Sequence, residues 1–208
     1  MGRIVFDTAT SLNGWIADEQ NSLAWLFAVG GGEQPEEDLM PEGCTVLVEG
    51  STTYQWVLDE QDILTHPERW RDFHGDRPTF VFTTRQLPVP EDANIRFVRG
   101  SVADALPAIR EAAGDGNIWV VGGGDLAGQF LDAGALDEIA LSVAPVALTG
   151  GAPLLPRRVE SDRLRLESAR PVGQFARLVY RVLPSGSAGS QRPDRRHDDQ
   201  DGAGGGQR

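Results

Sequence analysis

Three short segments of the sequence combine glycines, hydroxyl side chains and an arginine in a pattern that suits anion binding. Each directly follows an apolar run typical of a β-strand; the segments are Gly50, Ser51, Thr52 and Thr53; Thr83, Thr84 and Arg85; and Gly122, Gly123 and Gly124. In an open α/β sheet, ligands bind beyond the carboxyl ends of the strands, where the next helix begins. Because free amides and the helix dipole attract negative charge there, these segments predict a site for a phosphorylated ligand.

The charge composition restricts how such a ligand can be held. The chain has 208 residues and a formal net charge of -12, and all 19 basic residues are arginine because the sequence contains no lysine. A lysine-dependent P-loop and Schiff-base chemistry are therefore excluded. So acidic a chain is also poorly suited to the phosphate backbone of nucleic acids. We expect backbone amides, hydroxyls and a few arginines to hold the anion, and we expect no nucleic-acid partner.

The sequence predicts neither a metal site nor a membrane attachment. Cys44, His66 and His74 are the soft metal ligands of the expected domain, and they show no ligand spacing. No apolar run approaches the roughly 18 residues that cross a bilayer, and the first residues do not resemble a secretory signal. A single cysteine suits a reducing compartment. We therefore expect a cytoplasmic protein without a resident metal.

The apolar pattern predicts one α/β domain with three layers. Strands are expected over residues 3–10, 45–49, 79–84, 95–99 and 118–121, with closing strands within 137–148 and 176–183. Helices are expected after Gly50 and from Ser101 onward, where Asp104 completes a start that resembles a capping box. Residues 66–78 are interpreted as a loop. Strands that alternate with helices are typical of a sheet covered by helices on both faces.

The last part of the chain has a different composition. Residues 184–208 are rich in Gly, Ser, Arg and Asp and show no apolar periodicity. Such a segment cannot bury enough surface to offset the entropy of ordering it. We therefore expect a single domain over residues 1–183, followed by a disordered polar tail over residues 184–208.

The second glycine segment superficially fits a dinucleotide-binding fingerprint. Gly122, Gly124 and Ala127 match the G-x-G-x-x-A spacing. However, the segment comes late in the domain, and no acid stands about 20 residues further on to bind a ribose. After Glu138 the next acidic residue is Glu160. The sequence therefore argues against a Rossmann domain.

Five longer segments resemble a known family. They are residues 11–18 (SLNGWIAD), 47–57 (LVEGSTTYQWV), 81–85 (VFTTR), 120–139 (VVGGGDLAGQFLDAGALDEI) and 142–156 (SVAPVALTGGAPLLP). Their order is similar to that of the dihydrofolate-reductase fold. It most closely resembles the C-terminal reductase domain of the bifunctional riboflavin-biosynthesis deaminase/reductase and its stand-alone relatives. The resemblance covers about Arg3 to Leu183, and no His/Cys/Cys signature of a zinc deaminase occurs in the sequence.

The resemblance implies a fold and an activity. It implies an α/β, dihydrofolate-reductase-like domain of three layers with a mixed, mostly parallel central sheet. It further implies an NADPH-dependent reductase that transfers a hydride to a small heterocyclic or ribosyl substrate, as 5-amino-6-(5-phosphoribosylamino)uracil reductase does, and a homodimer. Two alternatives remain open: a dihydrofolate-type reductase, and a catalytically degenerate NADPH-binding dimer with a sensing or structural role.

The resemblance also assigns cofactor contacts to four parts of the chain. Ala9 and Ile16 would face the nicotinamide, and Asn13 and Gly14 would shape the loop that closes over it. The pyrophosphate would lie between two helix starts, formed by Gly50, Ser51, Thr52 and Thr53 and by Gly122, Gly123, Gly124, Asp125 and Leu126. Thr83, Thr84 and Arg85 would hold the adenosine 2′-phosphate, with Ser101 near the adenine. Two positions depart from common forms of these motifs, since Ser51 stands where relatives often have arginine and Asn13 where they often have aspartate.

Reduction also requires a proton source near the nicotinamide. Folate reductases use a buried carboxylate on the helix after the first loop, and that region is short and rich in glycine here. Asp38 is one candidate by position. Asp7 is the other, because it lies two residues before Ala9 and so on the same face of the first strand. If neither is buried beside the nicotinamide, water donates the proton.

Overall fold

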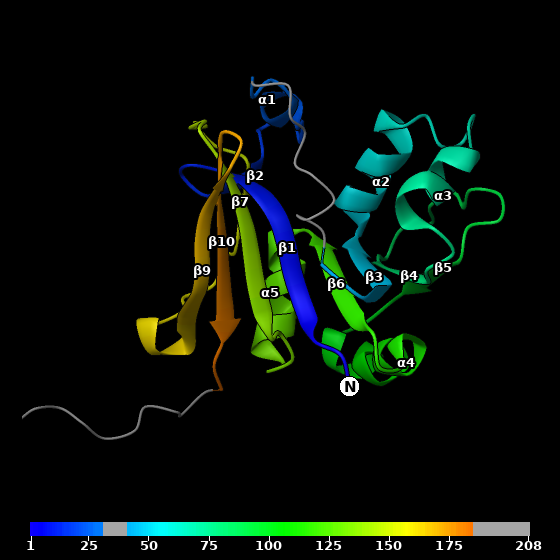
Figure 1. Cartoon of the computed structure of the whole chain (residues 1–208). Coiled ribbons are helices and arrows are strands. Elements are labelled where there is room, and N and C mark those ends of the chain that lie inside the picture. The colour runs from blue at the N-terminus through cyan, green and yellow to red at the C-terminus, as the bar shows by residue number, and fades with distance from the viewer. Residues whose placement is uncertain (31–40, 185–208) are drawn as a thin grey trace, which may run out of the picture.

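Among residues 1–30 and 41–184, which the computed structural model describes, eight strands pair into one central sheet (Figure 1). They are β1 (Ile4–Ser11), β3 (Cys44–Gly50), β4 (Thr79–Phe82), β5 (Ile95–Val98), β6 (Asn117–Gly122), β7 (Glu138–Ala144), β9 (Leu164–Val172) and β10 (Phe175–Val182). Their spatial order is β5-β4-β3-β6-β1-β7-β10-β9. The pairs from β5 to β7 are parallel, whereas β10 is antiparallel to both β7 and β9. The predicted mixed, mostly parallel sheet is therefore confirmed.

Helices cover both faces of the parallel part of the sheet. On one face, α4 (Val102–Ala113) and α5 (Gly124–Asp132) enclose a core that includes Phe6, Val48 and Phe130. On the other face, α2 (Ser51–Glu60) and α3 (Glu68–His74) enclose a second cluster around Tyr54 and Val81. Strands that are buried on both faces need apolar residues at consecutive positions. This explains why β1, β3 and β6 read as nearly continuous apolar runs.

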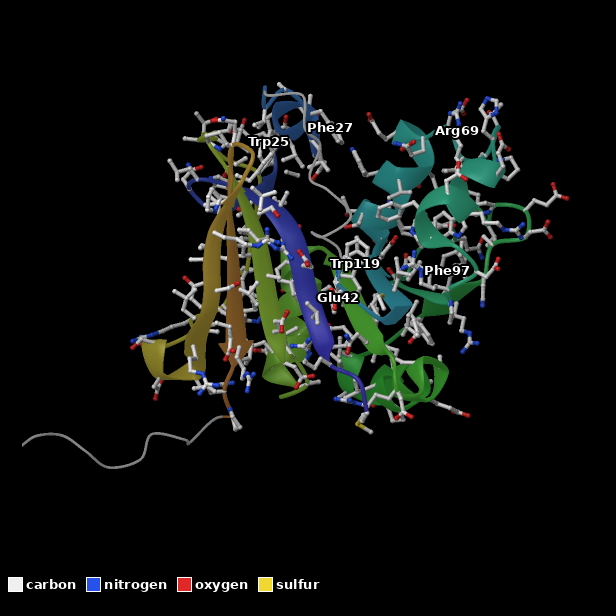
Figure 2. All side chains as sticks on the ribbon, in the orientation of Figure 1. Trp25, Phe27, Glu42, Arg69, Phe97 and Trp119 are labelled. Carbon is white, nitrogen blue, oxygen red and sulfur yellow. The ribbon has the colours of Figure 1, made fainter. Side chains whose placement is uncertain are left out.

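Smaller elements gather at the carboxyl end of β1. In Figure 1, β2 (Trp15–Ala17) and the short α1 (Ala24–Phe27) lie beyond this end. β2 pairs with β8 (Ala152–Pro153) in a separate two-stranded sheet. α1 reaches toward α2, since the ring of Phe27, which is labelled in Figure 2, stacks on that of Trp56 with centroids 6.3 Å apart.

The structure corrects the prediction that residues 66–78 form a loop. They contain α3, which begins after Pro67 and ends before Gly75. Proline just ahead of a helix and glycine just after it are normal boundary signals, and Trp70 and His74 are spaced for one buried face. The pattern was therefore present, but the histidines and arginines around it made the segment look solvated.

β9 is an edge strand that the sequence pattern does not predict. Most of its residues are exposed, so it lacks the alternation of buried and exposed positions that marks a strand. Pro171 within it is tolerated at an edge. By contrast, the predicted start of α4 is confirmed, because the Ser101 hydroxyl accepts a hydrogen bond from the Asp104 amide at 3.2 Å.

Two further predictions bear on the limits of the domain. The expected tail covers residues 184–208, of which residues 185–208 lie outside the described residues. Within the described part of the chain, no helix combines the length and the apolar character that spanning a bilayer requires.

Candidate functional site

The two glycine turns lie side by side at the carboxyl ends of neighbouring strands. Gly50 ends β3 and is the N-cap of α2, and Gly123 follows β6 and is the N-cap of α5. β3 and β6 are parallel partners, with Glu49 opposite Gly122. A Cβ atom added to Gly50 would lie 3.5 Å from the backbone nitrogen of Gly123. The structure therefore brings together the two helix starts that the sequence predicts to bind the pyrophosphate.

Both helix starts offer amides that no side chain of their N-cap residue satisfies. Gly50 and Gly123 have extended backbone and, being glycines, provide no side-chain cap. The first amides of each helix lack an intrahelical partner and carry partial positive charge. A Cβ atom on Gly123 would meet nothing within 4 Å, so its backbone is open to a ligand. These features fit the diphosphate of a dinucleotide, which needs close backbone approach and N–H donors.

The neighbouring glycines serve the protein itself. A Cβ atom on Gly122 would lie 2.9 Å from the hydroxyl oxygen of Thr53, and one on Gly124 would lie 2.2 Å from the carbonyl oxygen of Pro153. The peptide bond between Gly122 and Gly123 is cis. Leu126 points into the core beneath the sheet, so only its backbone can face a ligand. Gly122 and Gly124 therefore allow close packing within the protein, whereas Gly123 faces open space.

The third predicted segment lies against the start of α2. The Arg85 guanidinium donates a hydrogen bond to the carbonyl of Ser51 at 2.9 Å, and the Arg85 amide donates to the Thr83 hydroxyl at 3.0 Å. Thr83 is buried, whereas Thr84 and Arg85 are exposed. The structure therefore places the guanidinium of Arg85 beside Ser51, the residue directly after Gly50. Ser101, which the resemblance places near the adenine, uses its side-chain hydroxyl to cap the N-terminus of α4.

The turn between β1 and β2 is tied to a distant loop. Gly14 adopts a left-handed backbone (φ 86°), which glycine reaches at no steric cost. The Asn13 amide donates to the carbonyl of Leu148 at 2.7 Å and accepts from the amide of Leu148 at 3.0 Å. The Leu154 amide donates to the carbonyl of Gly14 at 2.9 Å. Asn13 and Gly14 thus shape this turn, although the turn's proximity to a nicotinamide stays a prediction.

The same loop joins the turn to the second glycine segment. Pro153 pairs with Trp15 through β8 and β2, and its carbonyl also abuts Gly124 at the start of α5. The resemblance places Ala9 and Ile16 at the nicotinamide. Both are partly buried, Ala9 on β1 and Ile16 on β2, on either side of the turn that contains Asn13 and Gly14. The parts assigned to the nicotinamide and to the pyrophosphate are therefore connected by residues 146–154.

Replacing Asn13 by aspartate tests this connection. Aspartate cannot donate to the Leu148 carbonyl and would place a negative charge against it, so we expect the free energy of unfolding to fall by about 1 kcal/mol. Urea denaturation measures the change. Asn21→Asp is the matched control, since Asn21 also lies in an exposed turn, with φ 57°, and should unfold as the wild type does. Equal stability of the two variants would show that the Asn13 side chain does not secure the loop.

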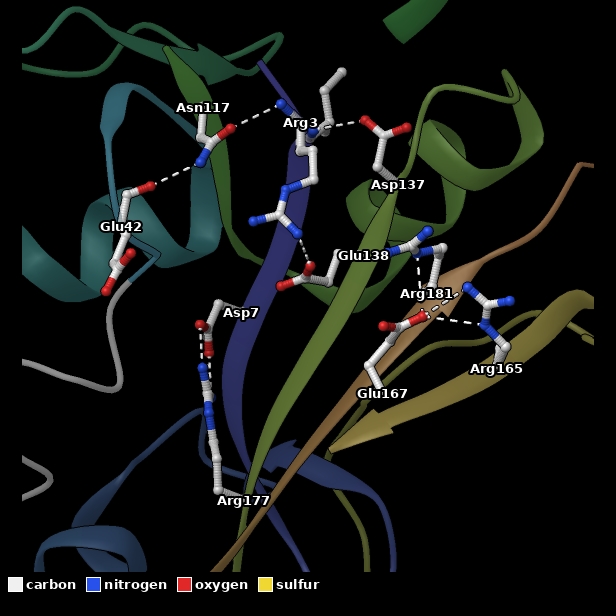
Figure 3. Close-up of polar contacts among 11 residues, drawn as sticks. Arg3, Asp7, Glu42, Asn117, Asp137, Glu138, Arg165, Glu167, Arg177 and Arg181 are labelled. Atoms are coloured by element: carbon white, nitrogen blue, oxygen red, sulfur yellow. Dashed lines mark hydrogen bonds and ion pairs between the residues drawn. The ribbon is translucent and has the colours of Figure 1, made fainter. Parts of the chain in front are cut away.

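Asp7 forms a buried ion pair on the face of the sheet that carries Ala9. The Arg177 guanidinium donates to both carboxylate oxygens of Asp7, at 2.6 and 2.5 Å (Figure 3). It also donates to the Ser142 hydroxyl at 3.2 Å. The three residues come from β1, β10 and β7, and Ser142 pairs in register with both Ala9 and Arg177. Asp7 and Arg177 are 5% and 6% exposed. The cluster therefore lies within the sheet face. The sequence pattern indicates Asp7, but neither its partner Arg177 nor Ser142, which accepts a hydrogen bond from Arg177.

The environment of Asp7 brings the pKa of its carboxyl close to neutral pH. Burial raises the pKa of Asp7 to about 6, the hydrogen bonds and charge of Arg177 oppose this rise, and the nearby Glu138 adds to it. The indole of Trp119, which is labelled in Figure 2, donates a hydrogen bond to the backbone carbonyl of Asp7 at 2.9 Å. A carboxyl that titrates near pH 6 can either accept or give up a proton under physiological conditions. Asp38, the other candidate acid, lies outside the described residues.

A second buried polar pair lies directly under the first glycine turn. Glu49 precedes Gly50 in β3, and its Oε1 atom lies 2.8 Å from Nε2 of His74. Both side chains are fully buried, and the His74 ring stacks on Trp70 with centroids 3.5 Å apart. His74 is therefore shielded from any substrate. A charged residue at the end of an apolar strand is the signal in the sequence that could have revealed this pair.

Comparison with known proteins places the chain in a family. The RibD C-terminal domain family matches residues 3–176. The uncharacterized Bacillus subtilis protein YwjB is 30% identical over 179 residues, which span 86% of this chain and 97% of YwjB. The uncharacterized protein YyaP of the same organism is 26% identical over 183 residues, which span 86% of this chain and 94% of YyaP.

Solved structures share the fold. A Shewanella sp. PV-4 protein assigned to riboflavin biosynthesis is 26% identical, with a TM-score of 0.65 over 88% of this chain and 99% of that one. The Thermotoga maritima diaminohydroxyphosphoribosylaminopyrimidine deaminase/5-amino-6-(5-phosphoribosylamino)uracil reductase is 15% identical, with a TM-score of 0.59 over 88% of this chain and 57% of that one. A Corynebacterium diphtheriae pyrimidine reductase-like protein is 16% identical, with a TM-score of 0.58 over 88% and 92% of the two chains. The match over most of its length shows that this chain belongs to the RibD C-terminal domain family.

Proposed function

We propose that the protein is an NADPH-dependent reductase that transfers a hydride to a small heterocyclic or ribosyl acceptor, as in the reductase step of riboflavin biosynthesis. The observation that carries this proposal is the pair of adjacent helix starts capped by Gly50 and Gly123. Membership in a family that includes the reductase part of a bifunctional enzyme supports it. We further expect a homodimer, in line with the resemblance, and a cytoplasmic location, which the single cysteine suits.

The residues of each helix start have distinct tasks in this proposal. The amides of residues 50–53 and 122–126 would bind the pyrophosphate, and Arg85, with Thr83 and Thr84, would bind the 2′-phosphate. Ala9 and Ile16 would line the nicotinamide position, with Asn13 and Gly14 in the turn beside it. When bound there, NADPH supplies the hydride. The protein has then to exclude water, orient the acceptor and provide a proton.

We assign the proton to Asp7. Its carboxyl shares a sheet face with Ala9 and is held in one orientation by Arg177, which also donates a hydrogen bond to Ser142. A pKa of about 6 leaves a useful protonated fraction at neutral pH. This buried, oriented acid favours a catalytic protein over a degenerate cofactor-binding dimer. A dihydrofolate-type reductase remains the alternative acceptor class.

The pH dependence of turnover follows from the raised pKa of Asp7. If the protonated carboxyl donates the proton, kcat/KM should be highest below about pH 6 and should fall about tenfold per pH unit above it. The rate of NADPH oxidation with 5-amino-6-(5-phosphoribosylamino)uracil as acceptor measures this profile. Asp7→Asn should lower the rate by about 10²- to 10⁴-fold and remove the decline. A wild-type rate that does not change across this range would exclude Asp7 as the donor.

Cofactor preference provides the experiment that tests the proposed function. Arg85→Ala removes the guanidinium next to Ser51, so we expect NADPH to bind about tenfold more weakly while NADH binding is unchanged. Fluorescence titration of both nucleotides measures the two dissociation constants. Arg71→Ala is a matched control because it removes the same charge from the exposed face of α3. An equal loss of affinity for both nucleotides would contradict the assignment of the 2′-phosphate to Arg85.

A further inference from the structure

An arginine from a distant loop lies along the surface of α5. The Arg157 guanidinium donates through Nε to Asp132 at 2.7 Å and through Nη1 to Asp125 at 3.0 Å. The two aspartates are seven residues apart on α5 and so lie on one face, two turns from each other. The Arg157 guanidinium thus bridges two acids on one face of α5.

The absence of a side chain at Gly128 leaves space on α5 for Arg157, and we call this space the seat of Arg157. A Cβ atom on Gly128, between the two aspartates, would lie 2.8 Å from the central carbon of the guanidinium and 3.0 Å from its Nε. Glycine at this position therefore allows Arg157 to lie flat against the helix. The Arg157 side chain is 24% exposed, although both of its partners are largely exposed. One glycine and two acids on α5 thus form a fitted site for one arginine.

Asp125 lies at the helix start where the pyrophosphate is proposed to bind, so its negative charge would repel the phosphate. It occupies the first turn of α5, directly after Gly124. Hydrogen bonds from Gln129 and Arg157 lower the pKa of Asp125, so it is ionised at neutral pH. A carboxylate at a helix N-terminus stabilises the helix, but it competes with any other anion for the same amides. A dinucleotide pyrophosphate at this helix start would therefore be repelled unless a cation offsets Asp125.

We infer that Arg157 is a positioning residue for the dinucleotide, because it offsets the charge of Asp125 at the phosphate end of α5. The inference rests on the proposed function, since it presupposes a phosphate at this helix start. Without Arg157, the Asp125 carboxylate acts as an uncompensated negative charge beside the pyrophosphate. The resulting loss of affinity is electrostatic, so salt screens it.

Two substitutions displace the same guanidinium by different routes. Arg157→Gln removes its charge, and Gly128→Ala fills its seat while replacing glycine by a better helix former. In each variant we expect the dissociation constant for NADPH to rise about three- to tenfold at low ionic strength. The variant that carries both Arg157→Gln and Gly128→Ala should bind NADPH no more weakly than the single variant with the lower affinity. The difference from wild type should shrink in about 1 M salt, where the Debye length is about 3 Å.

Rescue by charge removal separates this role from a structural one. Asp125→Asn in the Arg157→Gln background should restore NADPH affinity to within about twofold of wild type, because the repelling charge is gone. Asp132→Asn leaves the pair of Arg157 with Asp125 intact and should bind NADPH as the wild type does. A purely structural role for Arg157 would lower the melting temperature and would give no rescue by Asp125→Asn.

Calorimetric titration of the full chain and its variants with NADPH decides the matter. The expected result is weaker binding by both single variants and recovery in Asp125→Asn/Arg157→Gln. If the wild type binds NADPH and Arg157→Gln binds it equally well, or if the double variant shows no recovery, this inference is wrong and the proposed function stands. If the wild type does not bind NADPH, both fail together.

Discussion

Replacing Arg177 by methionine is expected to lower the free energy of unfolding by about 3–5 kcal/mol at neutral pH, because it leaves the Asp7 carboxylate buried without its guanidinium partner. The cost should depend on pH. Loss of Arg177 raises the pKa of Asp7 further above its unfolded value of 3.8, so the folded state binds a proton more tightly than the unfolded state. Stability of the variant should therefore fall as pH rises from about 4, and the cost should be small at about pH 4.

A double variant tests whether the pair acts as a unit. Asp7→Leu/Arg177→Met replaces both charges by apolar groups, and such exchanges are often neutral or stabilising. We expect the double variant to be more stable than Arg177→Met alone, as measured by guanidinium chloride unfolding. Equal destabilisation of single and double variants, with no pH dependence, would mean that the loss comes from packing and that the ion pair is not coupled.

Alanine should lower the stability of the protein at Gly124 but not at Gly123. Gly124→Ala places a Cβ atom 2.2 and 2.3 Å from the carbonyl oxygens of Pro153 and Leu154, which are backbone atoms and cannot rotate away. We expect it to lose about 1–3 kcal/mol of stability by overpacking. It should also weaken dinucleotide binding, because Leu154 holds the carbonyl of Gly14.

Gly123→Ala should leave the fold intact and act on the ligand alone. Gly123 has φ −86°, which any residue adopts, and its Cβ atom would meet nothing within 4 Å. The melting temperature should match the wild type. Affinity for NADPH should still fall at least about tenfold, because the methyl group occupies the space through which a phosphate approaches the backbone. Full affinity in a stable Gly123→Ala variant would show that no ligand approaches this turn closely.

The sequence was sufficient to predict most of the fold because its parallel strands are buried on both faces. β1, β3 and β6 are apolar over consecutive positions, and this signal does not depend on the partner strand. β9 was not predicted because an exposed edge strand leaves no periodic pattern. α3 was missed because its buried face contains His74, a residue type that is buried less often than the aliphatic residues that mark a core.

The candidate site likewise contains features that local sequence patterns indicate and features that only the fold brings together. Local patterns indicated the glycine turns, and the parallel order of β3 and β6 then places them together. The partners that define their chemistry come from far along the chain: Arg177 is 170 residues from Asp7, and Arg157 is 32 residues from Asp125. No local pattern reports such a pairing. Sequence therefore identified the backbone of the candidate site, and the charged side chains around it required the fold.

Calorimetric titration of the wild-type chain with NADPH tests the central claim most directly, namely that two adjacent helix starts bind the diphosphate of a dinucleotide. Saturable binding is expected, with a dissociation constant between about 1 μM and about 1 mM, the usual range of KM values for enzymes. Absence of saturable binding of both NADPH and NADH at several-fold higher concentrations, about 5 mM, would contradict the claim.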